Sequence, residues 1–195
     1  MYSVLIDGDK IERIITPTEI ENFHVAPATI DLAGAEIELV STLSREFRLK
    51  KALDSVRDRY DYIVIDAPPS LGLLTVNGLT AADSVIVPIQ CEYYALEGLS
   101  QLVSTIAMVQ EHLNPTLEWE GVVMTMYDVR TNLSQQVIED VKTYFQNTVR
   151  VYDSIIPRNV RLGEAPSFGK PIALYDPKSK GAEAYAKLAE EVLSS

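Results

Sequence analysis

The sequence contains few of the residues that build metal centres, disulfide frameworks or membrane spans. It has one cysteine, Cys91, and two histidines, His24 and His112. A single cysteine excludes an intramolecular disulfide, and two histidines far apart in the sequence argue against a zinc cluster. No apolar run approaches the roughly 18 residues of a membrane-crossing helix, and the N-terminus lacks the basic and then apolar order of a signal peptide. We therefore expect a cytoplasmic protein with one domain over residues 1–195, in which Cys91 is a packing residue.

Positive charge is scarce over the first two thirds of the chain. The net charge is −11, and residues 1–127 carry 8 Lys or Arg against 19 Asp or Glu. Residues 128–195 carry 9 of each kind. This balance excludes nonspecific nucleic-acid binding by the whole surface. Any basic patch must be built locally, from the C-terminal third.

One apolar stretch stands out near the first third of the chain. Residues 62–65 read Tyr-Ile-Val-Ile and lead into Asp66, Ala67 and the pair Pro68-Pro69. The apolar run predicts a buried parallel strand. A constrained loop is expected to follow it, because the two prolines fix the backbone and end the strand. A single aspartate at the carboxyl end of such a strand is suited to hold Mg²⁺ beside the phosphates of a nucleotide. The alternative is that Asp66 caps a helix starting near Leu71.

Strands and helices alternate along the rest of the chain, which is the pattern of a parallel sheet with crossover helices. The first 27 residues predict a short helix around Ile11 to Ile15 and a short strand at 23–27. Residues 160–180, rich in proline and glycine, are expected to be irregular. The spacing of apolar residues predicts strands at 84–88, 118–126 and 149–156, and helices at 30–43, 44–59, 71–82, 96–112, 132–145 and 181–193.

Four stretches carry a family resemblance. They are residues 66–74 (Asp-Ala-Pro-Pro-Ser-Leu-Gly-Leu-Leu), 90–99, 130–134, and 156–162 with 175–177. In these stretches the chain resembles the ParA/Soj chromosome-partitioning ATPases, and the similarity extends from about Tyr2 to Leu193. It implies an α/β fold, with a three-layer, doubly wound, mostly parallel sheet of the P-loop NTPase type that lacks its N-terminal strands. Members use ATP-dependent dimerisation on DNA to segregate a chromosome or plasmid.

The resemblance also implies site residues, cofactors and partners. Asp66 matches the Walker B carboxylate for Mg²⁺, with Pro68 beside it, and Arg130 and Arg161 match arginines that hold nonspecific DNA. ATP and Mg²⁺ are the cofactors that it implies. The partners are a second copy of the chain, nonspecific DNA on the nucleoid and a ParB-type protein, with no membrane. The residues matching the adenine pocket are Met126, Pro157, Arg158 and Asn159.

The sequence departs from this family at its start. No Gly-x-x-x-x-Gly-Lys-[Ser/Thr] loop occurs in the 195 residues, and Met1 stands where the family has passed its second strand. Because that loop supplies most of the neutralisation of ATP phosphates, we expect no intact catalytic set, weak ATP binding and an exposed sheet edge that lowers stability or causes association. One reading is a truncated partitioning ATPase, and another is a non-enzymatic ParA-like binding module. A MinD-type protein would require an amphipathic, membrane-binding helix at its C-terminus, and residues 187–195 are too short and too acidic to form one.

Overall fold

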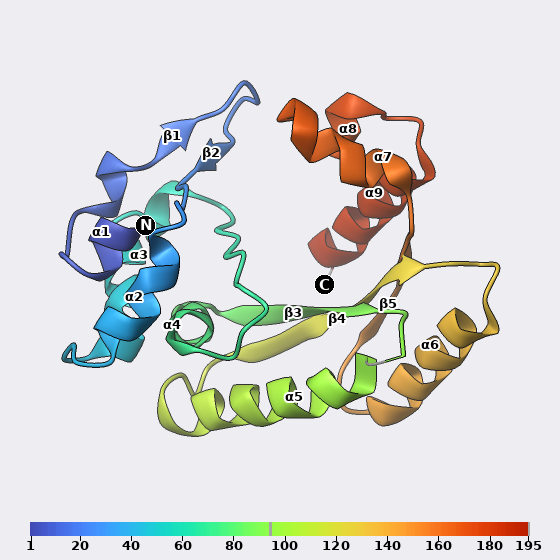
Figure 1. Cartoon of the computed structure of the whole chain (residues 1–195), viewed down its shortest axis with the longest axis horizontal. Coiled ribbons are helices and arrows are strands. Elements are labelled where there is room, and N and C mark those ends of the chain that lie inside the picture. Colours follow the sequence, from blue (N-terminus) through green and yellow to red (C-terminus); the bar gives the residue numbers. More distant parts are fainter. Residues whose placement is uncertain (94, 195) are drawn as a thin grey trace. The chain divides into compact units, whose positions relative to one another are not determined.

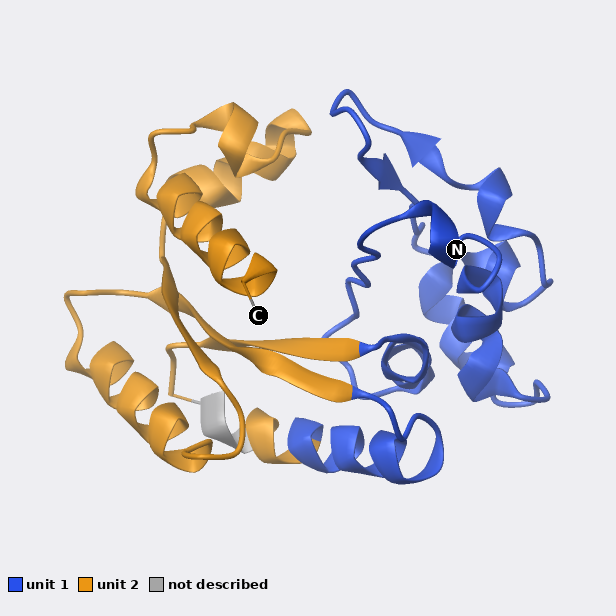
Figure 2. Cartoon of the chain, turned by 180° about the vertical axis from the view of Figure 1, so that it is seen from behind, with its two compact units in different colours: residues 1–83, 102–117 blue, residues 84–101, 118–195 orange. Residues whose placement is uncertain are grey.

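The computed structural model describes residues 1–93 and 95–194, with the backbone alone for residues 95–97. The chain packs as two compact units (Figure 2). Unit 1 comprises residues 1–83 and 102–117, and unit 2 comprises residues 84–101 and 118–195. The long helix α5 (Ala95–His112) begins in unit 2 and ends in unit 1. That residues 1–195 form one domain stays a prediction.

Unit 2 is built on a three-stranded parallel sheet in the order β3-β4-β5. The strands are β3 (Ser84–Gln90), β4 (Glu118–Tyr127) and β5 (Val151–Pro157). The strands predicted at 84–88, 118–126 and 149–156 are present, and the α/β class is confirmed. The central strand is buried on both faces, since Val122, Val123 and Met124 are each at most 4% exposed. This continuous burial is typical of a parallel sheet covered by helices on both sides.

Helices α6 (Asn132–Tyr144) and α9 (Lys180–Leu193) lie on opposite faces of this sheet (Figure 1). Thr131 caps α6 by accepting the Ser134 N–H. Ser179 caps α9 by accepting the Ala182 N–H at 3.2 Å. On the α9 face the core gathers side chains from both strands and helices. Its members are Val123, Tyr152 and Ile156, with Leu162, Ala184, Leu188 and Val192 packed against them.

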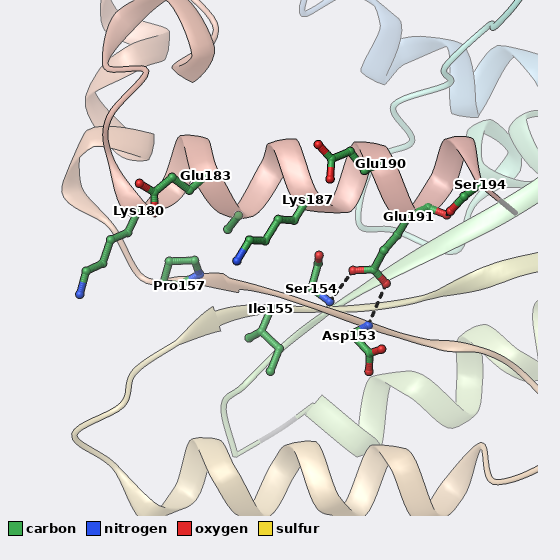
Figure 3. A pocket seen from close by; sticks show the side chains of 11 residues that line it. Asp153, Ser154, Ile155, Pro157, Lys180, Glu183, Lys187, Glu190, Glu191 and Ser194 are labelled. Carbon is green, nitrogen blue, oxygen red and sulfur yellow. Dashed lines mark hydrogen bonds between the residues drawn. The ribbon is translucent and has the colours of Figure 1, made fainter.

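Strand β5 contains an irregularity that α9 stabilises. Val122 pairs with Val151 and Met124 pairs with Ile155, so four residues of β5 span two of β4. The carboxylate of Glu191 on α9 accepts the Asp153 N–H at 3.0 Å and the Ser154 N–H at 2.8 Å (Figure 3). The pKa of Glu191 is lowered, first by a hydrogen bond from the Ser154 side chain and also by these amides. The bulge therefore keeps its backbone donors satisfied.

Unit 1 consists of short helices around two small apolar clusters. One cluster contains Val4, Ile11 and Val56, and the other contains Leu5, Leu49 and Ala81. A short antiparallel hairpin pairs β1 with β2. The elements are α1 (Tyr2–Leu5), η1 (Ile11–Arg13), β1 (Thr16–Pro17), β2 (His24–Val25), α2 (Leu32–Leu39), η2 (Arg45–Phe47), α3 (Arg48–Leu53), η3 (Arg57–Arg59) and α4 (Leu73–Ala81).

A buried asparagine joins two helices of unit 1. Asn77 on α4 is 1% exposed, and its Oδ1 accepts the Leu49 N–H of α3 at 3.1 Å. Its Nδ2 donates to the carbonyl oxygens of Arg45 and Leu73 at 2.8 and 2.9 Å. The side chain thus satisfies backbone groups at the start of α3 that the helix itself leaves open.

The strand predicted at residues 62–65 is wrong. These residues have no assigned secondary structure, and Tyr62 and Val64 are 67% and 91% exposed. Among the described residues no hydrogen bond involves the backbone of residues 61–67. A β-strand forms only where its backbone can hydrogen-bond to a neighbouring strand. Residues 62–65 have no such neighbour among the described residues, so their apolar composition does not produce a strand.

Two other predictions also require correction. The helix expected at 44–59 is broken into η2, α3 and η3, with Ser44 in the left-handed region at φ 53°. The region expected to be irregular, 160–180, contains three short helical segments. They are α7 (Val160–Glu164), η4 (Ala165–Phe168) and α8 (Ile172–Tyr175). Pro171 and Gly169 separate these segments instead of preventing them, because proline fits the start of a helix and glycine its end.

Candidate functional site

Three loops of unit 2 follow the carboxyl ends of β3, β4 and β5. Because the strands are parallel, these ends meet at one edge of the sheet, where α/β proteins bind ligands. Two backbone hydrogen bonds join the residues that follow β3 and β5 to the end of β4. Cys91 N–H donates to Thr125 O at 2.8 Å, and Arg158 N–H donates to Tyr127 O at 2.9 Å. We call this set the sheet-edge site. It comprises Glu92, residues 126–131 and residues 157–161.

Met126 has a strained backbone within this site. Its φ of 56° lies in the left-handed region, which a methionine rarely occupies. Here β4 advances three residues, from Met124 to Tyr127, while β5 advances two, from Ile155 to Pro157. Met126 is therefore part of a bulge, and its side chain is 38% exposed. Bulges and strained residues at a strand end often redirect a side chain toward a ligand.

The residues after β5 have structural roles that the sequence did not indicate. Pro157 ends the strand. The guanidinium of Arg158 forms an ion pair with Glu92, 66 residues away in the chain. Asn159 caps α7, its Oδ1 accepting the Arg161 N–H at 2.8 Å. The predicted base-side residues Met126, Pro157, Arg158 and Asn159 are thus brought together at the ends of two paired strands.

Arg130 is held by Asp128, which sequence analysis missed. Arg130 Nε donates to Asp128 Oδ1 at 2.9 Å, and Nη2 donates to Oδ2 at 2.6 Å. The Arg130 N–H donates to the same Oδ1 at 3.0 Å. These bonds, the side-chain ones first, keep the pKa of Asp128 well below its usual range, and the charge of Arg158 adds to this effect. The only sequence signal is an Asp-x-Arg spacing in a turn, which is common and not specific.

Arg161 lies between two carboxylates. Its Nη1 donates to Glu164 Oε2 at 2.8 Å, and its Nε lies 3.5 Å from Asp176 Oδ2. The Tyr175 hydroxyl donates to the same Glu164 oxygen at 3.1 Å. The hydrogen bond from Arg161 is the main reason that the pKa of Glu164 is lowered. Both arginines predicted from the family resemblance are therefore in intramolecular ion pairs.

Asp66 and Pro68 belong to unit 1. The carbonyl oxygens of Pro68 and Ser70 accept a hydrogen bond from Thr75 Oγ1 at 3.3 and 2.5 Å, which closes the proline loop onto α4. The capping alternative for Asp66 is wrong, because α4 begins after Gly72 and has no side-chain cap. Instead, the carboxylate of Glu36 lies 3.5 Å from the Leu74 N–H.

Asp66 does not fit a prepared magnesium site. Its side chain is exposed on a backbone that no strand pairs with, whereas a metal ligand is normally fixed by its supporting contacts. Among residues 1–93 and 95–194, no group of three His, Cys, Asp or Glu side chains could hold a metal ion. We therefore assign no catalytic step to Asp66.

Cys91 is buried at the end of β3, as predicted for a packing residue. Burial raises the pKa of its thiol to about 11, which leaves the side chain protonated near neutral pH. Its carbonyl oxygen accepts a hydrogen bond from Ser134 Oγ at 3.3 Å, so the residue connects β3 to the start of α6. No helix in the part of the chain that the structure describes is long and apolar enough to cross a membrane.

An open groove lined in part by charged side chains lies between β5 and α9 in unit 2 (Figure 3). Of the predicted site residues, Pro157 lines it. Lys180, Lys187, Glu183, Glu190 and Glu191 of α9 all line it. Its charges are mixed, and Glu191 is already engaged by the β5 bulge. The groove therefore presents no single-sign surface for a charged ligand.

Comparison with known proteins identifies close relatives. A family model described as an AAA domain matches residues 1–119. The sporulation initiation inhibitor protein Soj of Bacillus subtilis is 63% identical over 195 residues, which is all of this chain and 76% of that protein. The chromosome partitioning protein ParA of Myxococcus xanthus is 55% identical over 193 residues, covering 99% of this chain and 68% of its own length.

A solved structure agrees with these relatives. The cobyrinic acid a,c-diamide synthase of Mycobacterium smegmatis with bound ADP and magnesium is 40% identical, with a TM-score of 0.81 over 98% of this chain and 70% of that one. The three-stranded sheet and its helices thus match a P-loop NTPase-like fold. With identity above half along its full length, the chain belongs to the family of the Soj and ParA partitioning proteins.

Proposed function

We propose that this chain acts in chromosome partitioning, as the nucleotide- and DNA-contacting part of a Soj/ParA-type ATPase. In this proposal the protein is cytoplasmic, associates with the nucleoid and works as a homodimer with a ParB-type partner. The observation that carries the proposal is the sheet-edge site. It contains six of the residues implied by the family resemblance: Met126, Arg130, Pro157, Arg158, Asn159 and Arg161. They lie at or just after the ends of two paired strands, which the Arg158 N–H joins by donating to Tyr127 O.

The base of the nucleotide would contact unit 2. Met126 and residues 157–159 present an apolar side chain, a rigid proline and backbone groups at neighbouring strand ends. These are groups that can stack on and orient a purine without contributing to the chemistry of its phosphates. Bound ATP and Mg²⁺ would supply the reacting phosphoryl group and its charge neutralisation. No residue of this chain is assigned a hydrolytic role.

DNA would be held by arginines through its phosphates. Arg130 is 82% exposed and Arg161 is 55% exposed at the side chain, so a backbone phosphate can reach both. The planar guanidinium suits phosphate geometry, and such contacts carry affinity without sequence preference. This agrees with a whole-chain charge of −11 only because both arginines lie in the electrically balanced C-terminal third.

A direct test is the binding of labelled duplex DNA of mixed sequence to the 195-residue chain by fluorescence anisotropy over a salt series. We expect the double variant Arg130→Ala, Arg161→Ala to lower affinity at least about tenfold and to reduce the log–log salt slope by about 2. The control is Lys50→Ala, Lys51→Ala, which removes the same charge from α3 of unit 1. An equal loss in both double variants would show that net charge alone matters and would remove the assignment.

A non-enzymatic ParA-like binding module is the second candidate. The unpaired backbone around Asp66 favours it, because a chain that binds a partner or DNA needs no prepared magnesium ligand. Both candidates share the sheet-edge site, and they differ in whether nucleotide is turned over.

A further inference from the structure

Six of the nine positive side chains in residues 128–195 fall into two groups. Arg130, Arg158 and Arg161 are each engaged by a carboxylate: Asp128, Glu92 and Glu164, respectively. By contrast, the side chains of Lys170, Lys178 and Lys180 make no hydrogen bond or ion pair with any described residue. An approaching anion therefore first meets these three lysines, because the three arginines are already in ion pairs.

The Arg130 pair is bidentate, and its carboxylate is held in place by the loop. Both carboxylate oxygens of Asp128 engage the guanidinium, at 2.9 and 2.6 Å, and the backbone N–H of Arg130 fixes the same carboxylate. The side chain of Asp128 is 19% exposed while that of Arg130 is 82% exposed. The carboxylate is thus anchored in the loop, and the arginine folds back onto it.

The Arg161 pair repeats this arrangement with a different scaffold. Glu164 is three residues further along α7, and Tyr175 donates to the same Glu164 oxygen that accepts from Arg161. Asp176 supplies a second carboxylate 3.5 Å from Arg161 Nε. Here the anion is fixed by a hydroxyl from α8 instead of by a backbone amide.

We propose that Asp128 and Glu164 determine which anions this surface accepts, acting as internal competitors that occupy Arg130 and Arg161 until closely spaced phosphates displace them. The proposal rests on the DNA-binding function proposed above. A tethered carboxylate has a high effective concentration at its arginine, so an isolated phosphate ion in solution competes poorly. Duplex DNA competes well, because its phosphates act together and release counterions.

The surface position of these pairs makes such displacement feasible. An exposed ion pair is weak, so breaking one costs little compared with the gain from several phosphate contacts. The free lysines at 170, 178 and 180 can hold the polyanion near the site while the arginines exchange partners. The carboxylates would then filter single anions without blocking DNA.

The test removes each competing charge and keeps the shape. Asp128→Asn retains an oxygen that can accept the Arg130 N–H, and Glu164→Gln retains an acceptor for Tyr175. The matched control is Asp140→Asn on α6, an exposed carboxylate that makes no hydrogen bond or ion pair with the described residues. We expect Asp128→Asn and Glu164→Gln each to raise duplex affinity about 1.4- to 5-fold relative to this control, the range for releasing one exposed ion pair.

Selectivity gives the second readout. Inorganic phosphate titrated in the absence of DNA should bind Asp128→Asn more tightly than Asp140→Asn. A DNA affinity equal to that of Asp140→Asn would overturn the proposal. An affinity as low as that of Arg130→Ala would also overturn it, because the carboxylate would then orient the arginine for DNA instead of competing.

A DNA-free measurement separates this proposal from the proposed function. Phenylglyoxal modifies unpaired guanidinium groups, and peptide mass spectrometry reports the rate at Arg130 and Arg161 individually. We expect Asp128→Asn to accelerate modification of Arg130 and not of Arg161, and Glu164→Gln to do the reverse. Unchanged rates would refute masking even if DNA binds. Accelerated rates with no DNA binding in any variant would support masking and refute the DNA-binding function.

Discussion

Two stretches of similar sequence, residues 63–65 in unit 1 and residues 85–87 in unit 2, form different structures. The first reads Ile-Val-Ile and the second Val-Ile-Val. Residues 85–87 lie in β3, whose seven residues all pair with β4. Residues 63–65 have no pairing, and Val64 is 91% exposed. The comparison shows that β-branched composition specifies a strand only where a neighbouring backbone is present to complete its hydrogen bonds.

Hydrogen exchange is the measurement in which the two regions should differ most. Amides of residues 62–66 lack acceptors among the described residues, whereas those of β4 are paired on both sides. We expect exchange at 62–66 to be at least about a hundredfold faster than at residues 122–125, as for open and core segments of one protein. Strong protection of 62–66 in a concentration-independent, monomeric sample would break the comparison.

A matched pair of valine truncations tests the same contrast through stability. Val122 is 0% exposed at the centre of β4, and Val64 is 91% exposed. Val122→Ala should reduce the free energy of unfolding by about 1.5–3 kcal/mol, from lost burial and a residual cavity. Val64→Ala should change it by no more than about 0.5 kcal/mol. Urea unfolding followed by circular dichroism measures both, and similar losses would mean that residue 64 is buried in solution.

Met126 should show the smallest effect, and in the opposite direction. Glycine tolerates its φ of 56°, so Met126→Gly should remove a backbone strain of about 1–2 kcal/mol that Met126→Ala retains. Both variants lose the same atoms beyond Cβ, so their difference in unfolding free energy is the strain less the roughly 0.4–1 kcal/mol that glycine costs through its freer unfolded chain. Met126→Gly should still be the more stable of the two. An alanine variant more stable than the glycine variant would show that the left-handed conformation carries less strain than this.

Much of unit 2 could be predicted from sequence because its signals are local and agree with its packing. The apolar periodicity of α5, α6 and α9 and the β-branched runs of β3 and β5 each predicted the element that formed. The proline and glycine residues between 160 and 180 were misleading. They mark boundaries between short helices, and a residue that ends one helix can begin the next.

The site was less predictable than the fold. The family resemblance indicated the arginines, but not that Asp128 and Glu164 hold them, because an ion pair depends on side-chain geometry. Arg158 and Glu92 are 66 residues apart, and no spacing rule connects them. The strain at Met126 could not be predicted from the sequence either. It arises at a bulge, where β4 has one residue more than β5 between the last two paired positions.

The Glu191 carboxylate at the β5 bulge has a consequence for how this sheet can be extended. A further strand beside β5 would have to compete with Glu191 for the Asp153 and Ser154 amides. Among the described residues, β3 has one neighbouring strand, β4, and no side chain is seen to bond the backbone of its other edge. Backbone donors of the β5 edge are therefore already bonded to Glu191, whereas the β3 edge is open to a further strand. We expect a strand added from another segment or another chain to pair with β3.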